Sequence, residues 1–175
     1  MTKHKKIHNN KDLINRKRTL SRLMAIQIFY QFEFYEEQQD IALIKNNVID
    51  NYVLDQEDEI SSFRNKIDID LLESLLGGIS LGLTEIDFEI SQFLKDGWDL
   101  EKLPDIALYI LRFGAFELKF MRDVPLKVVI DEYVEISSTF FEDKKVTFIN
   151  GTLENMAKSY RAEEFKKIKN TKKNG

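Results

Sequence analysis

Cysteine is absent from this 175-residue chain, and glycine and proline are scarce, with seven and two residues. Without cysteine the chain forms no disulfide, thiolate zinc site or iron–sulfur cluster and has no thiol nucleophile, which suits a reducing cytosol. So few turn-forming residues exclude a sandwich or barrel of many short strands. No apolar run approaches the roughly 20 residues of a membrane-spanning helix, and the basic N-terminus lacks the apolar stretch of a signal peptide. We therefore expect a soluble protein of the cytoplasm.

Histidine is also scarce, and both copies, His4 and His8, lie in the polar N-terminal segment. A histidine general base or a histidine-assisted nucleophile is therefore not expected. A spacing of four residues suits a metal ion only on a helix, and the sequence predicts no helix there. Carboxylates are abundant, but most fall on the polar faces of predicted helices, although two that meet in space are not excluded. We expect no enzyme, no metal and no cofactor.

The net charge of −4 conceals basic ends on an acidic body. Residues 1–22 carry eight Lys or Arg against one Asp, residues 158–175 carry seven against two acids, and residues 23–157 carry 11 against 27. Basic ends favour contacts with anions, whereas the acidic body offers a surface for a different partner. Lysine-rich ends that only keep the chain soluble explain the charge pattern equally well. A pI near 5.4 argues against indiscriminate nucleic-acid binding.

Apolar residues recur at steps of three and four along most of the chain, which predicts helices. The predicted helices span residues 16–35, 40–53, 67–95, 103–121, from Pro125 to about 140, and 146–160. Asp40 is the expected N-cap of the second helix. No segment shows the alternation typical of a strand, so the predicted fold class is all-α. We divide the chain into a flexible basic arm (1–15), a helical domain (16–160) and a basic tail (161–175).

Three glycines interrupt the apolar pattern of residues 67–95, at positions 77, 78 and 82. Each glycine weakens a helix by roughly 1 kcal/mol relative to alanine, so each needs a reason. Close contact between two helices and a break between two helices are both adequate reasons. A phosphate-binding loop is excluded, because Leu83 stands where lysine is needed and no strand precedes the segment.

Three blocks of sequence are similar to one family. The first block runs from Arg16-Lys17-Arg18 to Tyr30 and contains Ala25-Ile26-Gln27. The second runs from Trp98 to Leu118 and contains Leu111-Arg112-Phe113-Gly114. The third begins with Asp123-Val124-Pro125 and is followed later in the chain by Phe148-Ile149-Asn150-Gly151. In order and spacing they resemble the NusB family of bacterial transcription antitermination factors. Residues 40–97 match that family only in pattern and length.

The resemblance implies a fold and a function. The fold is two small helical bundles, about seven helices, packed into one all-α domain. The function is binding of the boxA element of ribosomal RNA operons together with NusE, a small-subunit ribosomal protein. That assembly acts in the antitermination complex with RNA polymerase and other Nus factors. Residues 16–160 would then be an RNA-binding domain, and self-association into a homodimer is left open.

By the same resemblance, the start of the first long helix binds RNA. The implied contacts are Arg16, Lys17, Arg18 and Arg22 on phosphates, Gln27 and Tyr30 on an unpaired base, and Lys127 after Pro125. An ordinary solvated turn is the alternative for the basic run, and core packing is the alternative for Tyr30.

The resemblance also implies partner contacts and structural positions. Asp123 matches a family position at the NusE interface, and Asp99 and Glu101 are further candidates. Glu117 and Asn150 match family positions for which we expect buried hydrogen bonds or a helix contact.

The chain departs from the family pattern in the second half. Phe141 replaces the glycine that follows the penultimate helix, so that helix must end differently. Thr147 replaces a basic residue, which removes one expected phosphate contact. These departures bear on the RNA site more than on the fold.

Two other functions fit the same sequence. NusB-like domains also occur fused to ribosomal RNA cytosine methyltransferases, so a free-standing helical RNA-binding module in ribosomal RNA processing or ribosome assembly is one alternative. A protein adaptor that uses only its acidic surface is the other. RNA affinity of the isolated protein discriminates them, because an adaptor would show only salt-sensitive attraction to its basic ends.

Overall fold

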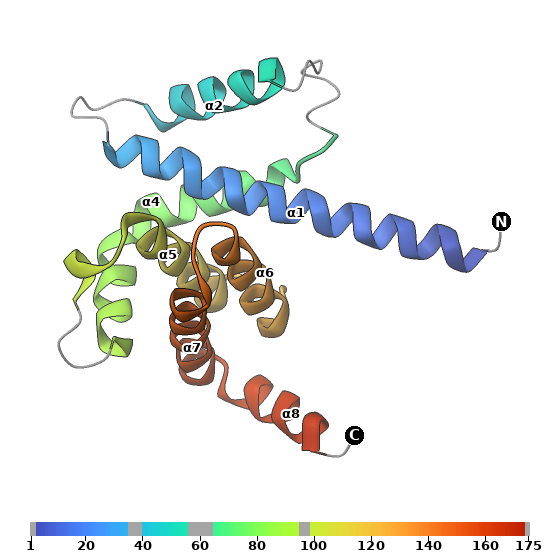
Figure 1. The fold of residues 1–175 in the computed structure, drawn as a ribbon, viewed down its shortest axis with the longest axis vertical. Helices are drawn as coiled ribbons and strands as arrows, with labels where there is room; N and C mark the ends of the chain where they lie inside the picture. Colours follow the sequence, from blue (N-terminus) through green and yellow to red (C-terminus); the bar gives the residue numbers. More distant parts are fainter. Residues whose placement is uncertain (1–2, 35–39, 56–64, 95–98, 174–175) are drawn as a thin grey trace. The chain divides into compact units, whose positions relative to one another are not determined.

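A computed structural model describes residues 3–34, 40–55, 65–94 and 99–173 (Figure 1). Its helices are α1 (Lys3–Phe34), α2 (Ile41–Asp55), α4 (Ile69–Phe93), α5 (Asp105–Phe120), α6 (Leu126–Ser138), α7 (Asp143–Tyr160) and α8 (Ala162–Lys173), with a short 3-10 helix, η1, at Leu100–Lys102. These described residues contain no strand. The all-α prediction is confirmed.

The chain forms two compact units, residues 1–76 and residues 77–175. Unit 1 holds α1, α2 and the start of α4, and unit 2 holds the rest of α4, η1 and α5 to α8. In unit 1, α2 packs along α1 (Figure 1). The middle of α1 supplies much of the core of this unit, through Met24, Ala25, Ile28 and Phe29, each at most 1% exposed.

Two aspartates begin helices of unit 1. Asp40 is the N-cap of α2, as predicted, because its Oδ1 accepts a hydrogen bond from the N–H of Ala42 at 2.9 Å. Asp68 is the N-cap of α4, because its Oδ1 accepts a hydrogen bond from the N–H of Leu71 at 3.0 Å. The hydroxyl of Ser21 on α1 lies 2.8 Å from both the carbonyl oxygen and the N–H of Asp68. Ser21 therefore fixes α1 against the N-terminus of α4.

Helix α5 is the central helix of unit 2. It packs against α6 and α7, which also pack against each other (Figure 1). Every residue from Tyr109 to Leu118 is buried, as expected of a central helix. A Cβ at Gly114 would lie 2.7 Å from Cδ2 of Leu153 on α7, so glycine is what lets the two helices approach this closely.

Two ionisable residues of α5 are buried with partners. Arg112 donates to both carboxylate oxygens of Asp87 on α4, at 2.8 and 2.7 Å. Glu117, which is fully buried, accepts a hydrogen bond from the hydroxyl of Tyr133 at 3.0 Å. The buried hydrogen bond expected of Glu117 is therefore present, and Asn150 is half-buried on α7.

The glycines of α4 do not break the helix, which runs continuously through all three. A Cβ at Gly78 would lie 1.9 Å from Cζ of Phe116, so α5 packs directly onto α4 at this glycine. A Cβ added at Gly77 or at Gly82 would have no neighbouring atom within 4 Å. Close helix contact is therefore the right explanation for Gly78, and a helix break is wrong.

Helices extend further toward both ends of the chain than the sequence predicts. The structure begins α1 at Lys3, and it continues past α7 with α8. The expectation that residues 1–15 hold no helix is thus corrected. Neither glycine nor proline occurs before Gly77, so no strong helix breaker is present in this segment. The division of function between arm, domain and tail stays a prediction.

Helix α6 ends without the glycine that the family pattern leads one to expect. The N–H groups of Phe140 and Phe141 both bond the carbonyl of Ser137, at 3.1 and 3.0 Å, and Thr139 keeps a right-handed backbone (φ −77°, ψ −19°). The hydroxyls of Ser137, Ser138 and Thr139 bond the carbonyls of Val134, Glu135 and Ile136, each at 2.7 Å. Hydroxyl groups and a tightened last turn thus satisfy the carbonyls that a glycine cap would otherwise bond.

Candidate nucleic-acid interface

The four basic residues at the start of the predicted RNA site lie on different sides of α1. Arg16 is exposed and Lys17 is half-buried. Arg18 keeps 34% of its side chain exposed, and its Nε lies 3.6 Å from Oδ2 of Asp68. Arg22 is only 1% exposed. The run is therefore not one uniform solvated turn.

Arg18 and Arg22, four residues apart, share the helix face that turns toward the interior of unit 1. Arg22 makes polar contacts inside the protein, and Arg18 faces the N-cap of α4. In contrast, neither Arg16 nor Lys17 forms an ion pair with a side chain of residues 16–34, 40–52, 65–94 or 99–167, the ranges whose side chains the structure describes. Their charges remain available to an anion such as a phosphate.

Arg16 and Gln27 lie on the same outer face of α1, because 11 residues make about three helical turns. This α1 face consists of Arg16, Leu20, Leu23, Gln27, Tyr30 and Phe34, none of which is buried. Helical pitch spreads it over roughly 27 Å along the axis. The face offers charge at its first residue, an amide in its middle and aromatic rings at its end.

The rings of Tyr30 and Phe34 stack at the end of this face. Their centroids are 5.7 Å apart and their planes differ by 25°. Tyr30 is half-buried, so it is not a fully enclosed core residue, and Phe34 is 73% exposed. Sequence reasoning missed Phe34, although a spacing of four residues from Tyr30 was the available signal. Exposed stacked rings suit an unpaired base, and the basic group at the other end of the same face suits a phosphate further along the strand.

Lys127 lies in unit 2, on the first turn of α6. It is exposed and its ammonium donates to Oδ2 of Asp131, one turn later, at 2.6 Å. An exposed pair of this kind contributes little stability and leaves the lysine free to exchange partners. Lys127 stays a predicted contact, separate from the residues of α1.

The three predicted partner contacts are exposed residues of unit 2. Asp99 caps η1 by accepting from the N–H of Lys102 at 3.2 Å. A hydrogen bond from the Lys102 side chain, aided by its charge, lowers the pKa of Asp99 below its ordinary value. Glu101 lies in η1, and Asp123 lies in the turn between α5 and α6. Asp99, Glu101 and Asp123 stay predicted partner contacts.

A groove of about 450 Å³ in unit 2 had no counterpart in the sequence analysis. Its lining residues are Phe93 at the end of α4 and Lys144, Thr147, Phe148, Gly151, Thr152 and Asn155 along α7. The groove brings together segments some 50 residues apart, which no local pattern reveals. Thr147, noted as a departure from the family, is one of its exposed residues.

A charged cluster joins α4, α5 and α7 within unit 2. The ammonium of Lys119 donates to Glu85 and Glu89, and the hydroxyl of Tyr160 donates to Glu89. Burial alone raises the pKa of Glu89, but the hydrogen bonds from Lys119 and Tyr160 outweigh it, so the pKa lies below its ordinary value. Hydrogen bonds to the two glutamates raise the pKa of Lys119. Burial and the bond to Glu89 raise the pKa of Tyr160.

Across the described ranges, histidine and acidic side chains form no group of three or more that could hold a metal ion. Within the same ranges, every helix is too short or too polar to cross a membrane.

Comparisons with known proteins agree on one family. Residues 19–158 match the model of the NusB family. The transcription antitermination protein NusB of Caulobacter vibrioides is 38% identical over 82% of this chain and 94% of that protein, and that of Novosphingobium aromaticivorans is 35% identical over 82% and 95%. Among solved structures, T. maritima NusB is similar with a TM-score of 0.66 and 29% identity, over 85% of this chain and 96% of that chain. Helix α8 lies beyond the residues that match the family model.

Proposed function

The chain belongs to the NusB family, and from this premise we propose that it binds boxA RNA of ribosomal RNA operons together with NusE, the small-subunit ribosomal protein. In this proposal the assembly acts in the cytoplasm, within the antitermination complex of RNA polymerase and other Nus factors. The observation that carries the RNA part is the α1 face, with an exposed Arg16 at its start and stacked aromatic rings at its end.

RNA binding on the α1 face divides into two kinds of contact. Arg16 on this face, and Lys17 next to it in the chain but outside the face, neutralise phosphates, which gives affinity without reading sequence. Tyr30 and Phe34 stack on unpaired bases, and the amide of Gln27 bonds a base edge, which gives the preference for one sequence. Arg18 and Arg22 act from behind this face, because they fix α1 in unit 1.

NusE binding uses the acidic residues of unit 2. Ribosomal proteins that bind RNA are typically basic, so exposed carboxylates attract them and speed association. Asp123 is the central contact of this proposal, with Asp99 and Glu101 as further contacts. Lys127, on the helix that follows Asp123, is proposed as an additional RNA contact.

Transcription of a template with a boxA leader and a downstream terminator tests the proposed function. Reactions contain RNA polymerase, NusE and the other Nus factors, with and without this protein. We expect the protein to increase readthrough on the boxA template and to have no effect when boxA is scrambled. Equal readthrough on both templates would contradict the antitermination role.

A further inference from the structure

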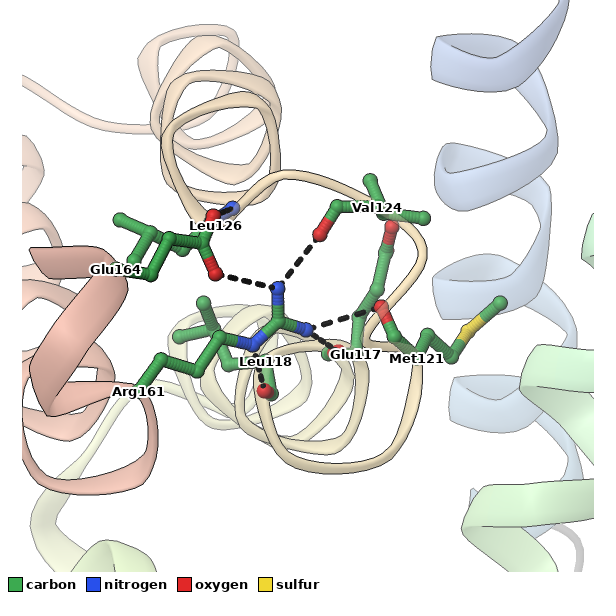
Figure 2. A network of polar contacts seen from close by, with 7 residues as sticks. All are labelled: Glu117, Leu118, Met121, Val124, Leu126, Arg161 and Glu164. Carbon is green, nitrogen blue, oxygen red and sulfur yellow. Dashed lines mark hydrogen bonds and ion pairs between the residues drawn. The ribbon is translucent and has the colours of Figure 1, made fainter. Parts of the chain in front are cut away.

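One buried arginine holds the turn between α5 and α6. Arg161, at the junction of α7 and α8, has a side chain that is 2% exposed. Its guanidinium donates to four backbone carbonyls, those of Leu118 (2.6 Å), Val124 (2.6 Å), Met121 (2.9 Å) and Glu117 (3.1 Å), as Figure 2 shows. Leu118 is one of the last four residues of α5, whose carbonyls have no N–H partner within the helix, so the positive charge of Arg161 also interacts favourably with the negative end of the helix dipole.

Asp123 lies in the middle of the turn that Arg161 holds. The N–H of Val124 bonds the carbonyl of Met121 at 3.1 Å, which closes a four-residue turn with Arg122 and Asp123 at its centre. The carbonyls at both ends of the turn accept from Arg161. Val124 is buried, whereas the two central residues are exposed. One guanidinium therefore fixes both ends of the segment that exposes Asp123.

Glu164 of α8 extends this link to the next helix. Its Oε2 lies 3.5 Å from Nη1 of Arg161, and its Oε1 accepts from the N–H of Leu126, the first residue of α6, at 2.8 Å (Figure 2). A carboxylate at this place satisfies an N–H that the helix cannot pair and interacts favourably with its dipole. The pair thus holds residues 121–125 at the end of α5 and at the start of α6.

We propose that Arg161 and Glu164 are positioning residues of the protein interface, which hold the turn so that Asp123 meets the basic partner in one geometry. This inference rests on the proposed function, because it takes Asp123 as a contact of NusE. A preorganised turn loses less conformational entropy on binding than a loose one. Loosening it therefore weakens binding without removing any contact between the two proteins.

Titration of NusE into full-length variants tests the proposal. Glu164→Ala removes both interactions of Glu164, and Glu163→Ala is the matched control, because Glu163 is its neighbour on α8 and pairs with Lys166 at the surface. We expect Glu164→Ala to weaken NusE binding about fivefold or more, and Glu163→Ala to leave it unchanged. Wild-type affinity in Glu164→Ala would overturn the proposal.

A double-mutant cycle with Asp123→Asn separates positioning from general destabilisation. If Glu164 acts through Asp123, Glu164→Ala has little further effect on NusE affinity once Asp123 is changed. The same loss of affinity in both backgrounds would contradict a positioning role. Unchanged RNA affinity of each variant shows that unit 1 is folded.

Amide hydrogen exchange in the free protein gives a readout that does not depend on NusE. We expect Glu164→Ala and Arg161→Lys to speed exchange at Val124, whose N–H closes the turn, while Ile110 in the middle of α5 keeps its wild-type rate. If the wild-type protein does not bind NusE, the proposed function fails. Wild-type exchange at Val124 in both variants would instead overturn the positioning role itself.

Discussion

Phe34 stacks on Tyr30 at the outer end of α1, with the ring centroids 5.7 Å apart and 73% of Phe34 exposed to solvent. Exposure of so large an apolar ring costs free energy unless a partner covers it, and an RNA base is such a partner. Phe34→Ala and Tyr30→Ala should each weaken boxA affinity about tenfold, since stacking contributes about 1–3 kcal/mol per base. Fluorescence titration of labelled RNA measures this loss.

Tyr30→Phe is the matched control for the aromatic pair. It keeps the ring and removes only the hydroxyl, so stacking predicts near wild-type affinity. A large loss in Tyr30→Phe, or wild-type affinity in Phe34→Ala, would contradict a stacking role for this pair.

The positive charges of Arg16 and Lys17 predict a salt-dependent contribution to RNA affinity. Arg16→Glu combined with Lys17→Glu should weaken binding and flatten the slope of log affinity against log salt by about 1.4, or about 0.7 per lost phosphate contact. Lys158→Glu is the control, because Lys158 is an exposed lysine of α7 in unit 2. An unchanged salt slope in the double variant would remove these residues from the RNA site.

Arg22 should behave differently from Arg16, because it is buried. Arg22→Leu leaves buried polar groups without their partner and should lower the free energy of unfolding by about 3 kcal/mol, whereas Arg16→Leu should lower it by less than about 0.5 kcal/mol. Chemical denaturation of both variants measures the contrast. Equal stability of the two would show that Arg22 is not part of the structure of unit 1.

The paired glycines of α4 give a prediction about packing in unit 2. Gly78→Ala should destabilise the protein by about 2 kcal/mol, because the new Cβ would overlap the ring of Phe116. Gly77→Ala, one residue earlier, meets no atom within 4 Å and should stabilise the helix by about 1 kcal/mol. Thermal unfolding of the two variants should therefore shift in opposite directions, and a shift in the same direction would contradict this packing.

The cluster around Glu89 predicts how stability depends on pH. Because its pKa is lowered in the folded protein, Glu89 contributes stability above its ordinary value of 4.5, and this is lost as the pH falls through the lowered pKa. The raised pKa of Lys119 has the opposite consequence. Lys119 contributes to folding stability below pH 10.5, its ordinary pKa, and this contribution is lost as the pH rises through the raised pKa. Glu89→Gln should therefore reduce folding stability at neutral pH. The variant should also lose less stability than the wild-type protein when the pH falls into the acid range.

Unfolding midpoints measured between about pH 3 and pH 8 check this prediction. Glu154→Gln serves as the control, because Glu154 is an exposed residue of α7 that forms no ion pair with the described residues. If both variants follow the wild-type acid profile, Glu89 does not stabilise the fold through its charge.

Local periodicity was enough to predict α2 and α4 to α7 and the buried character of α5, and residue type predicted the N-cap at Asp40, but neither predicted the first part of α1 or α8. Periodicity was not enough to tell which basic residues of α1 are exposed and which are buried. Arg16 and Arg22 look alike in a basic run, but contacts with distant parts of unit 1, such as that between Ser21 and Asp68 47 residues later, bury one side of the helix. The sequence therefore predicted an RNA-binding segment but did not show which side of that segment is exposed.

Long-range packing also explains what sequence reasoning missed in unit 2. Arg161 was counted among the charges of a basic tail, because its four carbonyl partners lie 37 to 44 residues earlier in the chain. Backbone carbonyls carry no sequence signature, so no motif marks such a site. The groove between Phe93 and α7 was missed for the same reason.

Titration of a boxA single-stranded RNA and a scrambled control, each with and without NusE and at several salt concentrations, shows whether this protein reads the boxA sequence. We expect a preference for boxA that NusE increases, that survives added salt, and that Phe34→Ala and the Arg16→Glu, Lys17→Glu double variant reduce. Equal binding of both RNAs that salt abolishes and NusE does not change would contradict it. Such a result would leave the fold intact and assign the RNA affinity to the basic ends of the chain.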